Sequence, residues 1–162
     1  MPYVSHLLAV AALVLEAGAD EDVAIAALLH DALEDTDLTA DEIAAQFGAR
    51  VASIVEACSD TTVQPKPPWR PRKEAYLARL RTEDDDVLLV SLADKLHNAR
   101  SMVADLEQVG PTVWSRFNAG PAEQLWWYRS LVAVFESRRP GPMADELARA
   151  VDRLADLASG DD

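Results

Sequence analysis

The chain has 162 residues, of which 49% are hydrophobic, and it carries a net charge of −13. This size allows one domain with a buried core, and the abundance of Ala and Leu with only 6 Gly favours an all-α fold. The acidic charge argues against general affinity for nucleic-acid polymers or anionic membranes. The single cysteine, Cys58, excludes an intramolecular disulfide, and the apolar run from Leu7 to Leu15 is too short to cross a membrane. We therefore expect a soluble cytoplasmic protein.

The first part of the chain predicts four helices. A nearly all-apolar run ends at Gly18, a favourable residue after a helix C-terminus, and Asp20 is a suitable N-cap for the next helix. Thr39 and Glu42 have the spacing of a capping box, and Gly48 ends the helix that they begin. The expected helices cover residues 4–17, 20 to about 34, 39–48 and 51 to about 58.

Prolines divide the rest of the chain. The four prolines between 65 and 71 exclude a regular helix from Ser59 to Pro71. Helices are then expected at 72–81, at about 87–106, in an aromatic segment that breaks near Gly120 and ends near 136, and at 143–157. The prediction is a single all-α helical bundle over residues 1–138. Residues 139–162 form a linker and a C-terminal amphipathic helix packed on the same domain.

The strongest chemical signal lies between His30 and Thr36. Four of these seven residues, His30, Asp31, Glu34 and Asp35, can bind a metal or move a proton. They directly follow an apolar run, where unpaired charges would be costly, so a metal or a fixed partner is expected. Helical spacing places Glu34 one turn from His30 and Asp35 one turn from Asp31. The alternative is a polar helix end with solvated acids, and this segment alone does not separate the two.

A second acid, Asp94, also lies within an apolar helical pattern. Asn98 and Ser101 follow it at four and seven residues and share its stripe, while Lys95 is a further candidate contact for a substrate. His6, on the first apolar helix, is the remaining candidate ligand. Taken alone, a histidine in that position is more often a core residue.

A basic segment interrupts the acidic chain. Between Pro65 and Arg81 there are six basic residues and one acid, which favours a small anionic ligand over a polymer. Arg72 and Lys73 could neutralise phosphates, and Trp69 and Tyr76 could stack on a base. A solvated basic helix with two aromatic residues in the core is an equal alternative.

These motifs, in this order, resemble the HD superfamily of metal-dependent phosphohydrolases, and more closely the Rel/SpoT-type alarmone hydrolases. The resemblance spans roughly residues 2 to 103. It implies that four side chains ligate one divalent metal, usually manganese in that family, and the mixed N/O donors also suit Fe, Co or Zn. It further implies that Glu34 and Asp35 position or activate water and that Asn98 and Ser101 contact a nucleotide. The implied metal ligands are His6, His30, Asp31 and Asp94.

The predicted function is metal-dependent phosphohydrolysis. The resemblance implies removal of the 3′-pyrophosphate of guanosine tetra- or pentaphosphate (ppGpp), the alarmone of the stringent response. An HD phosphatase acting on another nucleotide or phosphoester, and a nucleotide-binding module without turnover, are the alternatives. The family carries a helix and an Arg-Lys segment before the position of Pro2. Either the start of this chain has been placed too late, or the chain begins at Met1 and we expect its purine pocket to lack a wall. Sequence leaves open the metal's identity, the substrate and whether the chain forms a homo-oligomer.

Overall fold

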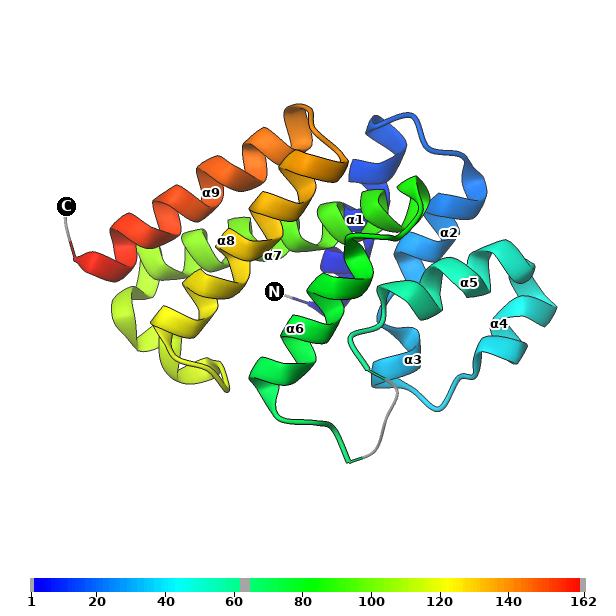
Figure 1. Ribbon diagram of the computed structural model, residues 1–162, viewed down its shortest axis with the longest axis horizontal. Coiled ribbons are helices and arrows are strands. Elements are labelled where there is room, and N and C mark those ends of the chain that lie inside the picture. The colour runs from blue at the N-terminus through cyan, green and yellow to red at the C-terminus, as the bar shows by residue number, and fades with distance from the viewer. Residues whose placement is uncertain (1, 62–64, 161–162) are drawn as a thin grey trace. The chain divides into compact units, whose positions relative to one another are not determined.

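The computed structural model describes residues 2–61 and 65–160, and every regular element within them is a helix (Figure 1). The predicted all-α fold is confirmed. Within the same residues, no helix combines the length and the hydropathy needed to span a bilayer. The elements are α1 (Tyr3–Glu16), α2 (Glu21–Leu29), α3 (Ala32–Asp35), α4 (Ala40–Phe47), α5 (Ala49–Cys58), α6 (Trp69–Leu80), α7 (Asp85–Val109), the 3-10 helix η1 (Gly110–Arg116), α8 (Pro121–Arg138) and α9 (Pro142–Ser159).

The chain divides into two compact units, residues 1–94 and 95–162, and the division falls within α7. In the first unit α2 packs against both α1 and α5, and α4 packs against α5. In the second unit α8 packs against α9. The boundary expected at 138/139 lies between α8 and α9, inside this second unit. The domain boundaries drawn from the sequence stay a prediction.

Local capping signals place the helix starts in the first unit. The Asp20 side chain accepts a hydrogen bond from the backbone N–H of Val23 (3.2 Å) and so caps α2. Thr39 and Glu42 form the expected capping box at the start of α4. Gly48, at φ 96°, adopts a backbone conformation that other residues avoid, and it separates α4 from α5.

The predicted end of the second helix, at about residue 34, is wrong. It stops at Leu29, and a separate one-turn helix, α3, follows at Ala32. The reason lies in the His30 ring, whose Nδ1 atom is 2.7 Å from the carbonyl oxygen of Ala27. This side-chain bond competes for a carbonyl that a continuing helix would use. His30 and Asp31 therefore lie in the turn between two helices.

Helix α6 begins earlier than predicted. It starts at Trp69 and carries Pro71 in its first turn, where a backbone N–H needs no partner within the helix. The expected irregular stretch therefore ends at Pro68. Residues 62–64, also part of that stretch, lie outside the described residues.

Candidate metal centre

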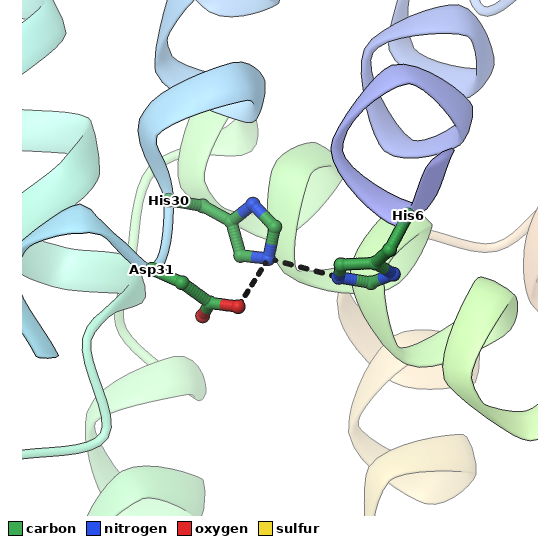
Figure 2. Close-up of side chains that lie close together, drawn as sticks. All are labelled: His6, His30 and Asp31. Carbon is green, nitrogen blue, oxygen red and sulfur yellow. Dashed lines mark hydrogen bonds and ion pairs between the residues drawn. The ribbon is translucent and has the colours of Figure 1, made fainter. Parts of the chain in front are cut away.

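Two histidines from neighbouring helices face each other in the first unit. His6 lies on α1 and His30 directly follows α2, and their side chains are almost fully buried, with 8% and 2% of each residue exposed. Their Nε2 atoms are 3.3 Å apart (Figure 2). Packing of α1 against α2 thus joins two ligand candidates that are far apart in the sequence.

The hydrogen bond between His30 Nδ1 and the backbone determines which ring nitrogen carries the proton. Because the carbonyl of Ala27 can only accept, Nδ1 of His30 must carry the proton and donate it. In the neutral ring, Nε2 then holds a free lone pair, which points toward His6 and Asp31 (Figure 2). This arrangement, a ring nitrogen fixed by a backbone carbonyl, is the usual support of a metal-binding histidine.

Two carboxylates complete the cluster. Asp31 Oδ2 is 3.3 Å from His30 Nε2, while Asp94 Oδ1, on α7, is 3.3 Å from His6 Nε2 and 3.6 Å from His30 Nε2. The candidate ligand atoms of His6, His30 and Asp31 all lie within 4.8 Å of one another. The structure thus brings together the four side chains that the sequence suggested as metal ligands, and a divalent metal fits this donor set.

The charges of this cluster call for a cation. Burial alone would lower the pKa of His30, but its hydrogen bonds to Asp31 and Asp94 outweigh that effect and raise the pKa to about 10. Burial would likewise raise the pKa of Asp31, but the hydrogen bond and charge of His30 lower it. Buried carboxylates are thus stabilised by the positive charge beside them, a role that a metal ion can also fill.

Tyr3 is a member of the site that the sequence reasoning missed. Its hydroxyl, one turn before His6 on α1, donates a hydrogen bond to Asp31 Oδ2. Burial, followed by this bond, raises the pKa of Tyr3, so the phenol stays protonated and remains a donor. The signal in the sequence was its i, i+3 spacing from His6, which places both side chains on one face of the helix.

The two acids suggested as catalytic residues lie on α3 and differ in their surroundings. Glu34 Oε1 accepts a hydrogen bond from the backbone N–H of Asp60 (2.7 Å), and Glu34 Oε2 is 3.3 Å from Lys66 Nζ. Asp35 is exposed, and its charge contributes to the raised pKa of Tyr3 after burial and Asp31. Among the described residues of the first unit, contacts that orient a carboxylate are thus seen for Glu34 and not for Asp35.

Two cations of the basic segment that were predicted to neutralise phosphates pair with an acid of the same unit, and their contact with phosphate stays a prediction. Arg72 and Lys73 both contact the carboxylate of Asp60. Tyr76 is 3% exposed, and its hydroxyl donates to Ser91 Oγ (3.0 Å), so it belongs to the core and does not fit the predicted stacking on a base. Trp69, at the start of α6, is half-buried and stays a candidate.

Three further substrate candidates lie on the part of α7 that belongs to the second unit. They are Lys95, Asn98 and Ser101. All three are half-buried, and their roles stay predictions.

Several known proteins are similar to this chain. The chain is 41% identical over 116 residues to the guanosine-3′,5′-bis(diphosphate) 3′-pyrophosphohydrolase MESH1 of Mus musculus. The matched region covers 70% of this chain and 61% of that protein. It is 38% identical over 107 residues to the Haemophilus influenzae guanosine-3′,5′-bis(diphosphate) 3′-pyrophosphohydrolase, covering 62% of this chain and 15% of that protein. The chain thus spans less than two thirds of the length of each of these relatives, 61% of one and 15% of the other.

Solved structures and a family model extend the comparison. The crystal structure of lmo0812 from Listeria monocytogenes EGD-e matches with a TM-score of 0.81 at 35% identity, covering 93% of this chain and 94% of that one. A structure described as a metazoan ortholog of SpoT that hydrolyses ppGpp matches with a TM-score of 0.75 at 28% identity, covering 94% and 82%. The family model described as HD domain matches residues 1–123, which include all four converging side chains. This chain therefore belongs to the HD-domain family.

Proposed function

We propose that this chain is a metal-dependent phosphohydrolase that removes the 3′-pyrophosphate from guanosine-3′,5′-bis(diphosphate). The observation that carries the proposal is that the side chains of His6, His30, Asp31 and Asp94 lie close together, three of them buried and Asp31 half-buried. The names of relatives that are 38% and 41% identical support the substrate. A small nucleotide substrate and a single buried cysteine are also consistent with action in the cytoplasm, as part of the stringent response.

The four side chains would hold one divalent metal through two imidazole nitrogens and two carboxylates. We favour manganese, with Fe, Co or Zn also compatible with these donors. When bound, the metal supplies Lewis-acid chemistry, which polarises a phosphoryl oxygen and lowers the pKa of water from about 15.7 towards 7 to 9. Tyr3 keeps Asp31 in place through its hydroxyl group.

Glu34 is the proposed general base. In the reaction, a water oxygen bonds to the phosphorus attached to the ribose O3′, and the bond from that phosphorus to O3′ breaks. Glu34 takes a proton from the attacking water, and the protonated Glu34 returns it, directly or through water, to O3′, which leaves as the ribose hydroxyl. General-base assistance of this kind contributes roughly 10²- to 10⁴-fold in rate. Asp35, exposed on the same short helix, would assist this proton transfer.

The test is a product analysis with the manganese-loaded protein. Guanosine-3′,5′-bis(diphosphate) is compared with a panel of nucleoside mono-, di- and triphosphates. Release of pyrophosphate and the 5′-diphosphate from the first substrate alone supports the proposal. Orthophosphate released from other nucleotides would instead indicate a general phosphatase, and binding without any product would indicate a nucleotide-binding module.

A further inference from the structure

Three cations of α6 hold the two residues that follow α5. The Asp60 carboxylate contacts Arg72, and its Oδ2 atom is 2.9 Å from Lys73 Nζ. These side chains are mostly buried, with 12% of Asp60, 15% of Arg72 and 17% of Lys73 exposed. Arg79 Nη2 donates to the carbonyl oxygen of Ser59 (2.8 Å) and also bonds that of Asp60. Both the side chain and the backbone of Asp60 are thereby fixed.

The backbone N–H of Asp60 is directed at Glu34. It lies 2.7 Å from Glu34 Oε1, which joins the end of α5 to α3. Helix α3 has only four residues, none of them buried, and no side-chain cap. So short an element has little packing of its own to fix a side chain. The hydrogen bond from Asp60 therefore restrains the carboxylate that α3 cannot hold by itself.

This arrangement is not the one that would stabilise the fold most. Asp60 Oδ1 and Arg72 Nε are buried and lack a hydrogen-bond partner among the described residues. Buried polar atoms without partners oppose folding, and a buried ion pair often stabilises no more than apolar residues of the same volume would. The buried charges are better explained by the position that they give to the turn.

We propose that Asp60 is a positioning residue for Glu34. Its carboxylate, held by Arg72 and Lys73, sets the turn whose N–H orients Glu34 for proton transfer. The inference rests on the proposed role of Glu34 as general base. This proposal also assigns a structural role to the basic segment, because two of its cations pair with Asp60.

The experiment is a double-mutant cycle with a matched control. Asp60→Asn removes one buried negative charge. Glu74→Gln removes one negative charge from the exposed face of α6, where Glu74 pairs with Arg70. Each change is measured alone and together with Glu34→Gln, recording kcat, KM and bound metal. We expect D60N to lower kcat at least tenfold, with KM within threefold of the wild type and the metal content unchanged. In the E34Q background D60N should cause no further loss, and E74Q should leave kcat unchanged in both.

Losses from D60N and E34Q that multiply would overturn the proposal, because they would show that Asp60 does not act through Glu34. Unchanged kcat in D60N, or metal lost in parallel with activity, would overturn it as well. If D60N does not fold, Lys73→Met, which removes one of the two cations on Asp60, takes its place in the cycle. Crystal structures supply a readout without turnover: Glu34 should keep one orientation in the wild type and lose it in the variant. If the wild-type protein hydrolyses no nucleotide, the proposed function fails, and these structures alone decide the role of Asp60.

Discussion

The Nε2 atoms of His6 and His30 lie 3.3 Å apart, and both residues are almost fully buried in the first unit. Two Nε2 lone pairs would repel each other at this distance, so either a proton or a metal ion must lie between the two nitrogens. Asp94, within 3.6 Å of both rings, adds negative charge to the same point. The pair of histidines therefore defines where a metal would bind, and it makes His30 the most informative residue to change.

His30→Ala should abolish stoichiometric metal binding. The change removes one nitrogen ligand and leaves Asp31 and Asp94 close to each other without the charge that stabilises them. Elemental analysis of the purified protein, after loading with manganese and desalting, measures the effect. His97→Ala is the matched control, since His97 is the third histidine of the chain and no role in the cluster is assigned to it. Equal metal content in the H30A and wild-type proteins would contradict the proposed centre.

Removing the metal should lower the thermal stability of the wild-type protein. A ligand present at 100 times its Kd stabilises the folded state by about 2.7 kcal/mol, and a chelator removes this contribution. We expect the Tm measured by calorimetry to fall on chelation and to recover with added manganese. The Tm of the H30A variant should respond to neither treatment. A wild-type Tm that is insensitive to the chelator would argue that the cluster is a buried polar network only.

Tyr3→Phe should weaken metal binding without unfolding the chain. Residue Tyr3 is 51% exposed. The variant keeps its aromatic ring and loses the hydrogen bond from the hydroxyl to Asp31. Loss of such a supporting contact typically costs about 10- to 100-fold in metal affinity or activity. Competition with a metallochromic indicator gives the affinity directly. An unchanged affinity would show that Asp31 needs no support from Tyr3.

The features that could be predicted from the sequence are those encoded locally. Asp20 and Thr39 act within three residues of their own positions, so the starts of α2 and α4 follow from spacing alone. The four cluster residues were indicated by acids and histidines inside apolar helices, together with the family resemblance. Their convergence still depended on the packing of α1 against α2 and on contacts with α7, which no spacing rule supplies.

The features that could not be predicted depend on tertiary contacts. Arg72 and Lys73 have the charge of phosphate ligands, and the sequence does not show that Asp60, on the other side of a proline-rich segment, pairs with both of them. Tyr76 was ambiguous because a basic helix with no clear apolar face does not reveal which side it buries. The helix ends before His30, where the buried ring bonds the carbonyl of Ala27, and the sequence does not show that this ring is buried.

Acid stability should depend on Arg50. Its guanidinium lies 2.7 Å from Asp20 Oδ2 and also pairs with Asp22 and Asp86. The hydrogen bond from Arg50, followed by the one from the backbone of Val23, lowers the pKa of Asp20 below its ordinary value of 3.8. A carboxyl whose pKa is lower in the folded state contributes stability that is fully present above the unfolded pKa. That contribution is lost as the pH falls through the folded pKa.

Arg50→Gln should therefore move the onset of acid unfolding to a higher pH. The variant brings the pKa of Asp20 in the folded protein closer to its value in the unfolded chain, so this carboxylate no longer favours the folded state between the two values. Because all these groups are well exposed, the shift should shrink as salt is added. Circular dichroism at 222 nm, followed from neutral pH to pH 2 at low and high salt, measures it. Arg149→Gln, which removes the same charge from an exposed position of α9, controls for net charge. An equal shift in both variants would assign the effect to overall charge and not to the contacts of Arg50.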